Sequence, residues 1–247
     1  MTIQTVTNAQ IILNTTDISG FVGNIEDVPG SVTVLETPNF AGGGFMSRIA
    51  GLKSGMFRVS GYADQAVTTG INSIFTPSNL GTSYTASAAL PAAAAAATGD
   101  KALFCTGLLS RYDGMNASTD AVMPMSMELA TTGAFVSSGR VGAPLASRTT
   151  AGYTGTAVAL TGPSATQSIY AVLHVTAAAG TNLAVKIQSD DNSGFTSATD
   201  RITFSTVSAV GVQTGSLAGD LSTETYWRVV ATIASVTFSF ACYFGVA

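Results

Sequence analysis

The chain has 247 residues, of which 46% are hydrophobic and only 10% are charged, with a net charge of −4 and one histidine. A globular domain normally has about 25% charged residues, so we expect other subunits of an assembly, rather than water, to cover most of this exterior. No stretch reaches the roughly 20 apolar residues of a membrane-spanning helix, and the basic residues are too scattered to hold nucleic-acid phosphates.

The N-terminal half is expected to consist of strands. The candidates are residues 31–36, 45–50, 56–62, 102–109 and 123–129. The last of these places Met123, Met125, Met127 and Leu129 on one face, because side chains alternate along a strand. A short helix from Asp64 to Phe75 is the only helix that the spacing favours, and its Thr and Gly residues weaken it.

The C-terminal half alternates more regularly. Strands are expected at residues 169–176, 183–189 and 201–207. Two further runs, 227–233 and 236–244, are separated only by Ala234 and Ser235, which predicts an antiparallel hairpin. Short strands at this spacing indicate a mainly β protein with little helix, built as an antiparallel β-sandwich or barrel.

Two domains are predicted from the composition. Residues 139–163 are rich in Gly, Ser, Thr, Ala and Pro, which suggests a boundary between a β domain at 1–148 and a second β-sandwich part at 149–247. Cys105 and Cys242 lie far apart in sequence and are expected to be free thiols, with Cys242 at a buried strand position. No basic residue precedes Ile11, so no secretory leader is expected and the chain is expected to be made in a cytoplasm.

The sequence offers little for catalysis. His174 lies in a predicted strand without Cys, His or carboxylate at metal-ligand spacing, so a structural role is favoured over catalysis. Residues 190–194, Asp-Asp-Asn-Ser-Gly, lack the later acidic ligand of a calcium loop and are expected to form a hairpin turn. We therefore expect no enzyme activity, no metal and no cofactor.

Two segments resemble known proteins. Residues 170–246, with Tyr-Ala-Val-Leu-His-Val, Leu-Ala-Val-Lys-Ile-Gln-Ser-Asp-Asp-Asn-Ser-Gly-Phe and Phe-Ser-Phe-Ala-Cys-Tyr-Phe-Gly-Val, look like C-terminal regions of bacteriophage tail proteins. Residues 28–64, with Val-Pro-Gly-Ser-Val-Thr-Val and Gly-Leu-Lys-Ser-Gly-Met-Phe-Arg-Val-Ser-Gly-Tyr-Ala-Asp, are similar in organisation to the major tail tube proteins of long-tailed, siphovirus-like bacteriophages.

The resemblance implies a structural virion protein of the phage tail, made in the host bacterial cytoplasm. Its copies would form stacked hexameric or pseudo-hexameric rings with other tail proteins, and DNA would pass through the lumen without specific binding. The glycine-rich segment would bind the adjacent ring, and carboxylates would face the lumen and repel phosphates. The candidate inter-ring residues are Asn39, Phe40, Ala41, Gly42, Gly43, Gly44, Phe45 and Met46, and the candidate lumen-facing residues are Glu36, Asp64, Asp113 and Glu128.

Other assignments stay open at this point. The sequence does not distinguish a hexameric ring from a trimer with pseudo-sixfold symmetry, or a C-terminal decoration from a second part of the tube wall. A different class of function is a binding module, either a capsid decoration protein or a β-sandwich adhesin for host-surface glycans. Loops near Tyr153 or Tyr226 would then carry the sugar site.

Overall fold

The computed structural model describes most of the chain. Residues 1–7, 38–46, 64–70, 76, 93–94, 115–122, 150–151, 181 and 235–236 lie outside the description, and for 27–37, 47–54, 72–73 and 77 only the backbone is described. Within these limits no helix is long and apolar enough to span a membrane.

The protein is mainly β, as predicted. A single helical turn, α1 (Ile71–Ile74), and two 3-10 turns, Ser19–Phe21 and Pro77–Asn79, are the helical elements of the described residues. The strands are β1 (Gln10–Leu13), β2 (Thr16–Asp17), β3 (Val22–Thr37), β4 (Ser47–Tyr62), β5 (Ser83–Leu90), β6 (Lys101–Asp113), β7 (Pro124–Arg148), β8 (Tyr153–Thr154), β9 (Val158–Ala159), β10 (Ser168–Ala178), β11 (Leu183–Asp190), β12 (Thr199–Thr203), β13 (Gly211–Ala218), β14 (Tyr226–Ile233) and β15 (Phe238–Val246).

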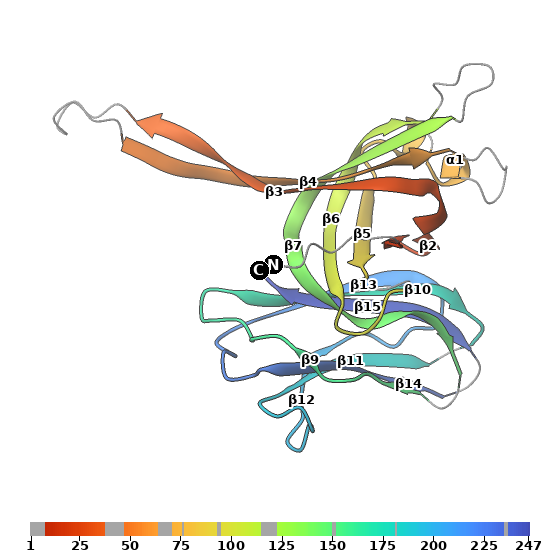
Figure 1. Ribbon diagram of the computed structural model, residues 1–247, viewed down its shortest axis with the longest axis vertical. Helices are drawn as coiled ribbons and strands as arrows, with labels where there is room; N and C mark the ends of the chain where they lie inside the picture. The colour runs from red at the N-terminus through yellow and green to blue at the C-terminus, as the bar shows by residue number, and fades with distance from the viewer. Residues whose placement is uncertain are drawn as a thin grey trace.

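One sheet of ten strands runs through both halves of the molecule (Figure 1). Its main order is β13-β10-β15-β7-β6-β5-β1-β2, and β4 joins at β7 and carries β3 on its other side. Strand β7 has 25 residues, pairing with β4 through its first part and with β15 through its last part. Register shifts interrupt its pairing with β6 and β15, and such bulges bend a strand. The bent β7 therefore connects the upper and lower parts in Figure 1.

A second sheet of five strands closes the lower part as a sandwich. It has the order β12-β11-β14-β8, with β9 also on β14. Its inner residues meet those of β10 and β15 in one core, which includes the fully buried Trp227, Phe238, Phe240 and Phe244. The indole Nε1 of Trp227 donates a hydrogen bond to the Leu160 carbonyl oxygen at 2.9 Å. The polar N–H group of this large ring therefore has a hydrogen-bond partner inside the sandwich.

The predicted hairpin between residues 227–233 and 236–244 is wrong. β14 pairs with β11, β8 and β9 in the five-stranded sheet, whereas β15 pairs with β10 and β7 in the ten-stranded sheet. Both strands alternate because both bury one face in the same core, from opposite sides. Alternation identifies the buried face of a strand but not its neighbour in the sheet.

The upper part has its own core, and a buried seam lies between the two. The upper core contains Phe57, Phe75 and, from the face predicted in β7, Met125, Met127 and Leu129. The seam is formed by residues from both halves of the sequence, namely Ile12, Ala89, Ala102, Phe104, Val136, Val141, Val172, Ala241 and Tyr243. The ten-stranded sheet and this seam join the two parts. The division at residue 148 itself stays a prediction.

Strands β3 and β4 form a long two-stranded ribbon. They pair from Val22 opposite Gly61 to Thr37 opposite Ser47, but β4 pairs with β7 only from Met56 to Tyr62. The remainder of the ribbon extends away from the body of the molecule (Figure 1). Residues 47–50 of the first predicted strand and residues 56–62 of the next are thus parts of one strand, while residues 45 and 46 lie outside the described residues.

Candidate functional site on the charged face of the upper sheet

A row of charged side chains crosses four strands in register. Glu26 of β3 lies opposite Arg58 of β4, Arg58 lies opposite Glu128 of β7, and Glu128 lies opposite Arg111 of β6. The neighbouring residues Phe57 and Leu129 are fully buried on the other face. The period of two along each strand therefore directs the charges away from the upper core.

The arginines of this charged row are held by carboxylates. Arg58 Nε lies 2.8 Å from Glu128 Oε2, and the Ser110 hydroxyl donates to Glu128 Oε1 at 3.3 Å. On β6, Arg111 Nε donates to Asp113 Oδ2, two residues further along the same strand, at 2.6 Å. Because these side chains are partly exposed, each pair contributes only about 0–1 kcal/mol to stability. Their consequence is electrostatic: both guanidinium groups already have an anionic partner.

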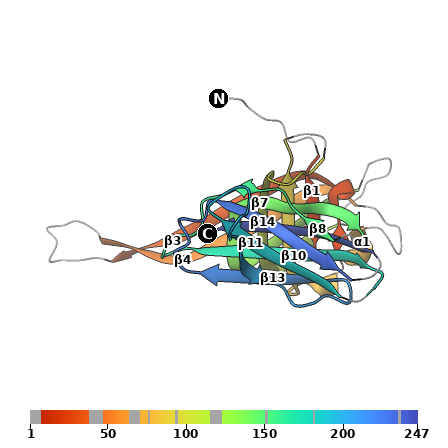
Figure 2. The same ribbon diagram turned by 90° about the horizontal axis from the view of Figure 1, so that it is seen from below.

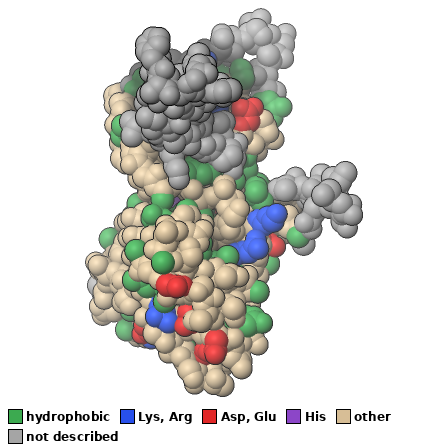
Figure 3. Space-filling view, turned by 90° about the vertical axis from the view of Figure 1, so that its left-hand side faces the viewer, with side chains coloured by type: hydrophobic (Ala, Val, Ile, Leu, Met, Phe, Trp, Pro, Cys, Tyr) green, Lys and Arg blue, Asp and Glu red, His purple; other side chains and the backbone are tan. Residues whose placement is uncertain are grey.

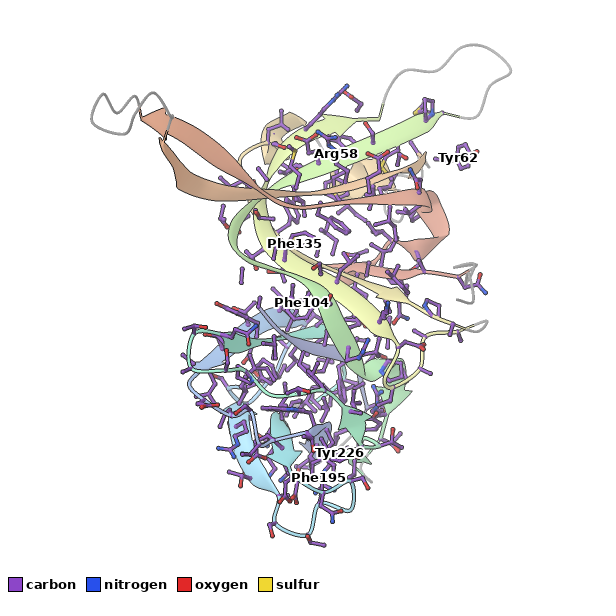
Figure 4. The ribbon with its side chains drawn as sticks, turned by 60° about the vertical axis from the view of Figure 1, so that its left-hand side comes forward. Arg58, Tyr62, Phe104, Phe135, Phe195 and Tyr226 are labelled. Atoms are coloured by element: carbon purple, nitrogen blue, oxygen red, sulfur yellow. The ribbon has the colours of Figure 1, made fainter. Side chains whose placement is uncertain are left out.

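The charged row lines a shallow hollow of about 260 Å³. Glu26, Arg58, Arg111 and Glu128 surround it together with Ser60 and Ser126. Figure 4 shows Arg58 in the upper part of the molecule, on the same sheet as the exposed Tyr62. When Asp113 is included, this surface has two arginines and three carboxylates, so its positive and negative charges nearly cancel.

The predicted site residues are only partly placed by the structure. Asp113 and Glu128 lie on the same face, on adjacent strands. Glu36 is in β3 opposite Arg48, and its side chain is not described. Asp64 and the segment Asn39–Met46 lie outside the described residues. Which surface faces a lumen is not tested, so the four lumen-facing residues stay a prediction.

Sequence reasoning missed the partners of the two carboxylates. Arg58 stands between buried Phe57 and Val59, and Arg111 follows a bulge in β6. The alternation around Arg58 indicates an outward-facing side chain, but its position opposite Glu128 depends on the register between strands that are 70 residues apart. No local pattern contains that information.

His174 links the two parts of the molecule from within. The ring is fully buried, with Nδ1 donating to the Asn14 carbonyl oxygen at 2.6 Å and Nε2 accepting from the Ser87 hydroxyl at 2.7 Å. Since Nδ1 faces a carbonyl it carries the proton, which leaves Nε2 as the acceptor. Burial lowers the pKa of His174 to about 4, so the ring is neutral at ordinary pH. This geometry is that of a structural link between β10, β5 and the β1–β2 turn.

Residues 190–194 form a turn that uses its own polar groups. The Asp190 carboxylate accepts from the backbone N–H groups of Asn192 at 3.2 Å and Ser197 at 2.8 Å, and Asn192 Oδ1 accepts from Gly194 N at 2.8 Å. The predicted turn is confirmed. In the described part of the chain, no three His, Cys, Asp or Glu residues are grouped to hold a metal ion.

One face of the molecule is poor in charge. Figure 3 shows one face on which few acidic or basic side chains are visible among polar, backbone and hydrophobic atoms. Cys105 and Cys242 are both buried thiols that form no disulfide bond, as predicted. Burial raises the pKa of the Cys242 thiol, which keeps it protonated and unreactive.

Comparison with known proteins finds no matching family model and no matching curated protein. Among solved structures, a protein from the tail of an empty GTA particle with C6 symmetry matches with a TM-score of 0.36 and 12% identity, over 51% of this chain and 92% of that one. The Dit protein of SPP1, described as a paradigm of the hub adsorption apparatus in phages infecting Gram-positive hosts, matches with a TM-score of 0.38 and 10% identity, over 98% and 100%. A protein of the phage p2 baseplate in its activated conformation matches with a TM-score of 0.30 and 10% identity, over 95% and 97%. These TM-scores are too low to establish a shared fold.

Proposed function

We propose that this chain is a non-enzymatic structural protein of a bacteriophage tail, which assembles into stacked rings that form a tube for DNA. The observation that carries the proposal is the β3–β4 ribbon, which extends beyond the sheet that anchors it (Figure 1). A two-stranded ribbon is at best marginally stable in water by itself. Packing against a neighbouring subunit would stabilise it, as the resemblance of residues 28–64 to tail tube proteins implies.

The charged row fits the passage of a polyanion. A protein holds DNA by placing unpaired lysine and arginine side chains at its phosphates. Here Glu128 and Asp113 occupy Arg58 and Arg111, so a phosphate would have to displace a carboxylate to reach either cation. We propose that this face lines the lumen, and that Asp113 and Glu128 act there mainly by occupying the arginines. Repulsion by excess negative charge, the role first expected of them, is then secondary.

The glycan-binding alternative has less support. Sugar sites commonly stack a ring against an open aromatic face, but Trp227 is fully buried. The Arg228 guanidinium covers the ring of Phe195, 4.1 Å from its centroid. Figure 4 places Phe195 and Tyr226 at the lower end of the molecule, away from the charged row.

Shortening the ribbon tests the proposal. Ser31 and Ser54 are direct partners in the ribbon, so replacing residues 32–53 by Asn-Gly closes a shorter hairpin with a favoured turn. Negative-stain microscopy and sedimentation should show rings or tubes for the full chain and only smaller species for the shortened one. Circular dichroism and the fluorescence of Trp227 in the distant sandwich verify that the variant folds. Rings that persist without the ribbon, or a full chain that stays monomeric at high concentration, would contradict the proposal.

A further inference from the structure

Strand β13 is an outer strand of the ten-stranded sheet. It pairs with β10 through eight consecutive residue pairs, from Ser168 opposite Ala218 to Val175 opposite Gly211, without a register shift. In the described part of the chain β10 is its only strand partner. Figure 2 shows β13 along the lower border of the molecule, with its outer side turned away from the body.

This edge lacks the features that normally prevent strands from joining. Proteins protect outer strands with charges, prolines, bulges or very short length. The β13 sequence, Gly-Val-Gln-Thr-Gly-Ser-Leu-Ala, contains no charged residue and no proline. An open strand of this length and regularity is a template for pairing with another strand.

The other terminal strands of the two sheets, within the described residues, are protected. β3 contains Glu26, Asp27 and Pro29 and has three register shifts against β4. β12 has five residues, including Asp200 and Arg201, with a register shift against β11. β2, β8 and β9 have two residues each. The contrast singles out β13.

An uncharged cleft lies beside the β13 edge. It has a volume of about 370 Å³ between β13, β10 and the bend of β6 and β7. Its walls include Phe104, Thr106, Thr132, Tyr170, Thr214 and Ser216, and none of the described residues that line it is charged. Figure 4 places Phe104 where the upper and lower parts of the molecule meet. In strand addition, backbone hydrogen bonds supply affinity while a neighbouring pocket receives alternate side chains.

Exposed apolar surface continues at the end of the strand. Val210, which directly precedes β13, is 54% exposed and is one of the few large hydrophobic side chains of the described residues that face solvent. Ser216 and Thr214 are also exposed on the cleft side. A strand added along β13 would lie beside Val210 at one end and beside the cleft residues Thr214 and Ser216 along its length.

We propose that β13 is a self-association edge, at which the β13 strands of two copies pair antiparallel across a two-fold axis. In such a pair each residue faces a symmetry-related position on the same strand. Any charged residue near the centre would therefore oppose its own kind, and β13 contains none. The pairing would make the two ten-stranded sheets continuous. It goes beyond the proposed ring, because it joins copies in pairs whether or not the β3–β4 ribbon forms rings.

Sedimentation of the full chain tests the pairing. Ser216→Lys places like charges near the axis, whereas Thr232→Lys adds the same charge at an exposed position of β14 in the other sheet. We expect wild type and Thr232→Lys to have the same mass, and Ser216→Lys to have half of it, with pairing weakened at least about tenfold, which corresponds to about 1.4 kcal/mol. Equal masses for all three proteins would overturn the proposal. Loss of rings upon shortening of the ribbon is a separate result and does not depend on it.

Single cysteines on β13 provide a second test that does not rely on added charge. Cys105 and Cys242 are buried, so a thiol introduced at Thr214, Ser216 or Ala218 is the one available for oxidation. Copper(II)–phenanthroline with oxygen should remove two electrons and two protons from facing thiols and form a disulfide between copies at one or two of these positions. Thr232→Cys should remain reduced. No disulfide at any β13 position, or equal cross-linking at Thr232, would contradict two-fold pairing.

Discussion

The two long outer strands of the ten-stranded sheet, β3 and β13, meet their surroundings in different ways. β3 carries acidic residues and a proline, is interrupted by register shifts, and continues into a ribbon that leaves the body. β13 is regular, uncharged and short enough to remain on the body throughout. The ten-stranded sheet thus has a charged, irregular edge at β3 and an uncharged, regular edge at β13.

This difference extends to the surfaces beside the two strands. Next to β3 lies the charged row of Glu26, Arg58, Glu128 and Arg111. Next to β13 lies a cleft whose described lining residues carry no charge. If both proposals hold, the chain concentrates its few charges where strands should not join or phosphates should not bind, and omits them where a second strand pairs.

The largest effect is expected from a core substitution that tests whether the two ends belong to one cooperative unit. Phe57 is fully buried in the upper core, and the single tryptophan, Trp227, is fully buried in the lower one. Phe57→Ala should cost about 3–5 kcal/mol. Because the sheet and the seam join the cores, the unfolding transition seen by Trp227 fluorescence should move to lower urea concentration. The exposed Tyr62→Ala serves as control and should move it little.

If the two ends unfold independently, Phe57→Ala will lower the stability measured by circular dichroism and leave the Trp227 transition in place. That outcome would make β3 and β13 borders of two separate bodies. It would also support the predicted division at residue 148.

The seam between the ends should respond to acid through His174. Burial lowers its pKa to about 4 in the folded protein, whereas the unfolded chain has the ordinary value of about 6.5. The unfolded state therefore binds the proton more tightly, and stability that is present above about pH 6.5 is lost as the pH falls towards about 4, by up to about 3 kcal/mol.

Urea denaturation at a series of pH values measures this loss. His174→Gln disturbs the two hydrogen bonds of the ring, so the stability of the variant should be lower than that of wild type near neutral pH. Because glutamine cannot take up a proton, the stability of the variant should also fall less steeply with acid. Carboxylates contribute equally to both proteins, which makes the difference in slope the relevant quantity. Parallel slopes would show that His174 does not control the acid response of the seam.

Much of this fold can be predicted from alternation along the chain. The positions of β10, β11, β14 and β15 follow from it, because each strand has one face in the lower core. Their partners do not follow, since β14 and β15 bury equivalent faces from opposite sheets. The full length of β7 is also hidden. Its last part, Gly139 to Arg148, is rich in small residues and contains a proline, but residues 140–148 pair with β15 and Gly139 and Arg140 also pair with β6, so tertiary pairing overrides weak local preference.

The close approach of β6 and β7 explains part of that composition. A Cβ on Gly139 of β7 would lie 2.9 Å from the Phe104 ring and 3.2 Å from the Ala102 carbonyl oxygen, both in β6, so a larger residue would force the two strands apart. In the charged row, the carboxylates Asp113 and Glu128 can be selected from the sequence, but Arg58 and Arg111 cannot be assigned to them. Register across distant strands creates these pairs, and a single residue of slip would remove them.

The smallest effect on stability, and the most direct test of the charged border, is expected from Glu128→Gln. The substitution removes the partner of Arg58 at 2.8 Å and should cost no more than about 1 kcal/mol, since the pair is partly exposed. It leaves the guanidinium free to meet a phosphate. Retention of double-stranded DNA in a gel-shift or filter assay at low salt should therefore rise for Glu128→Gln, more so with Asp113→Asn, and should disappear as salt is added.

Asp220→Asn separates this effect from a simple change in net charge. Asp220 accepts hydrogen bonds from the backbone N–H and the hydroxyl of Ser222. Asp220→Asn changes the net charge by the same amount as Glu128→Gln but leaves the Arg58–Glu128 pair intact. If both variants retain DNA equally, net charge governs the interaction and the carboxylates of the charged row act by repulsion alone. If only Glu128→Gln retains DNA, the Glu128 carboxylate acts by occupying Arg58. The contrast between the charged border at β3 and the uncharged border at β13 then reflects two different partners, a polyanion and a second strand.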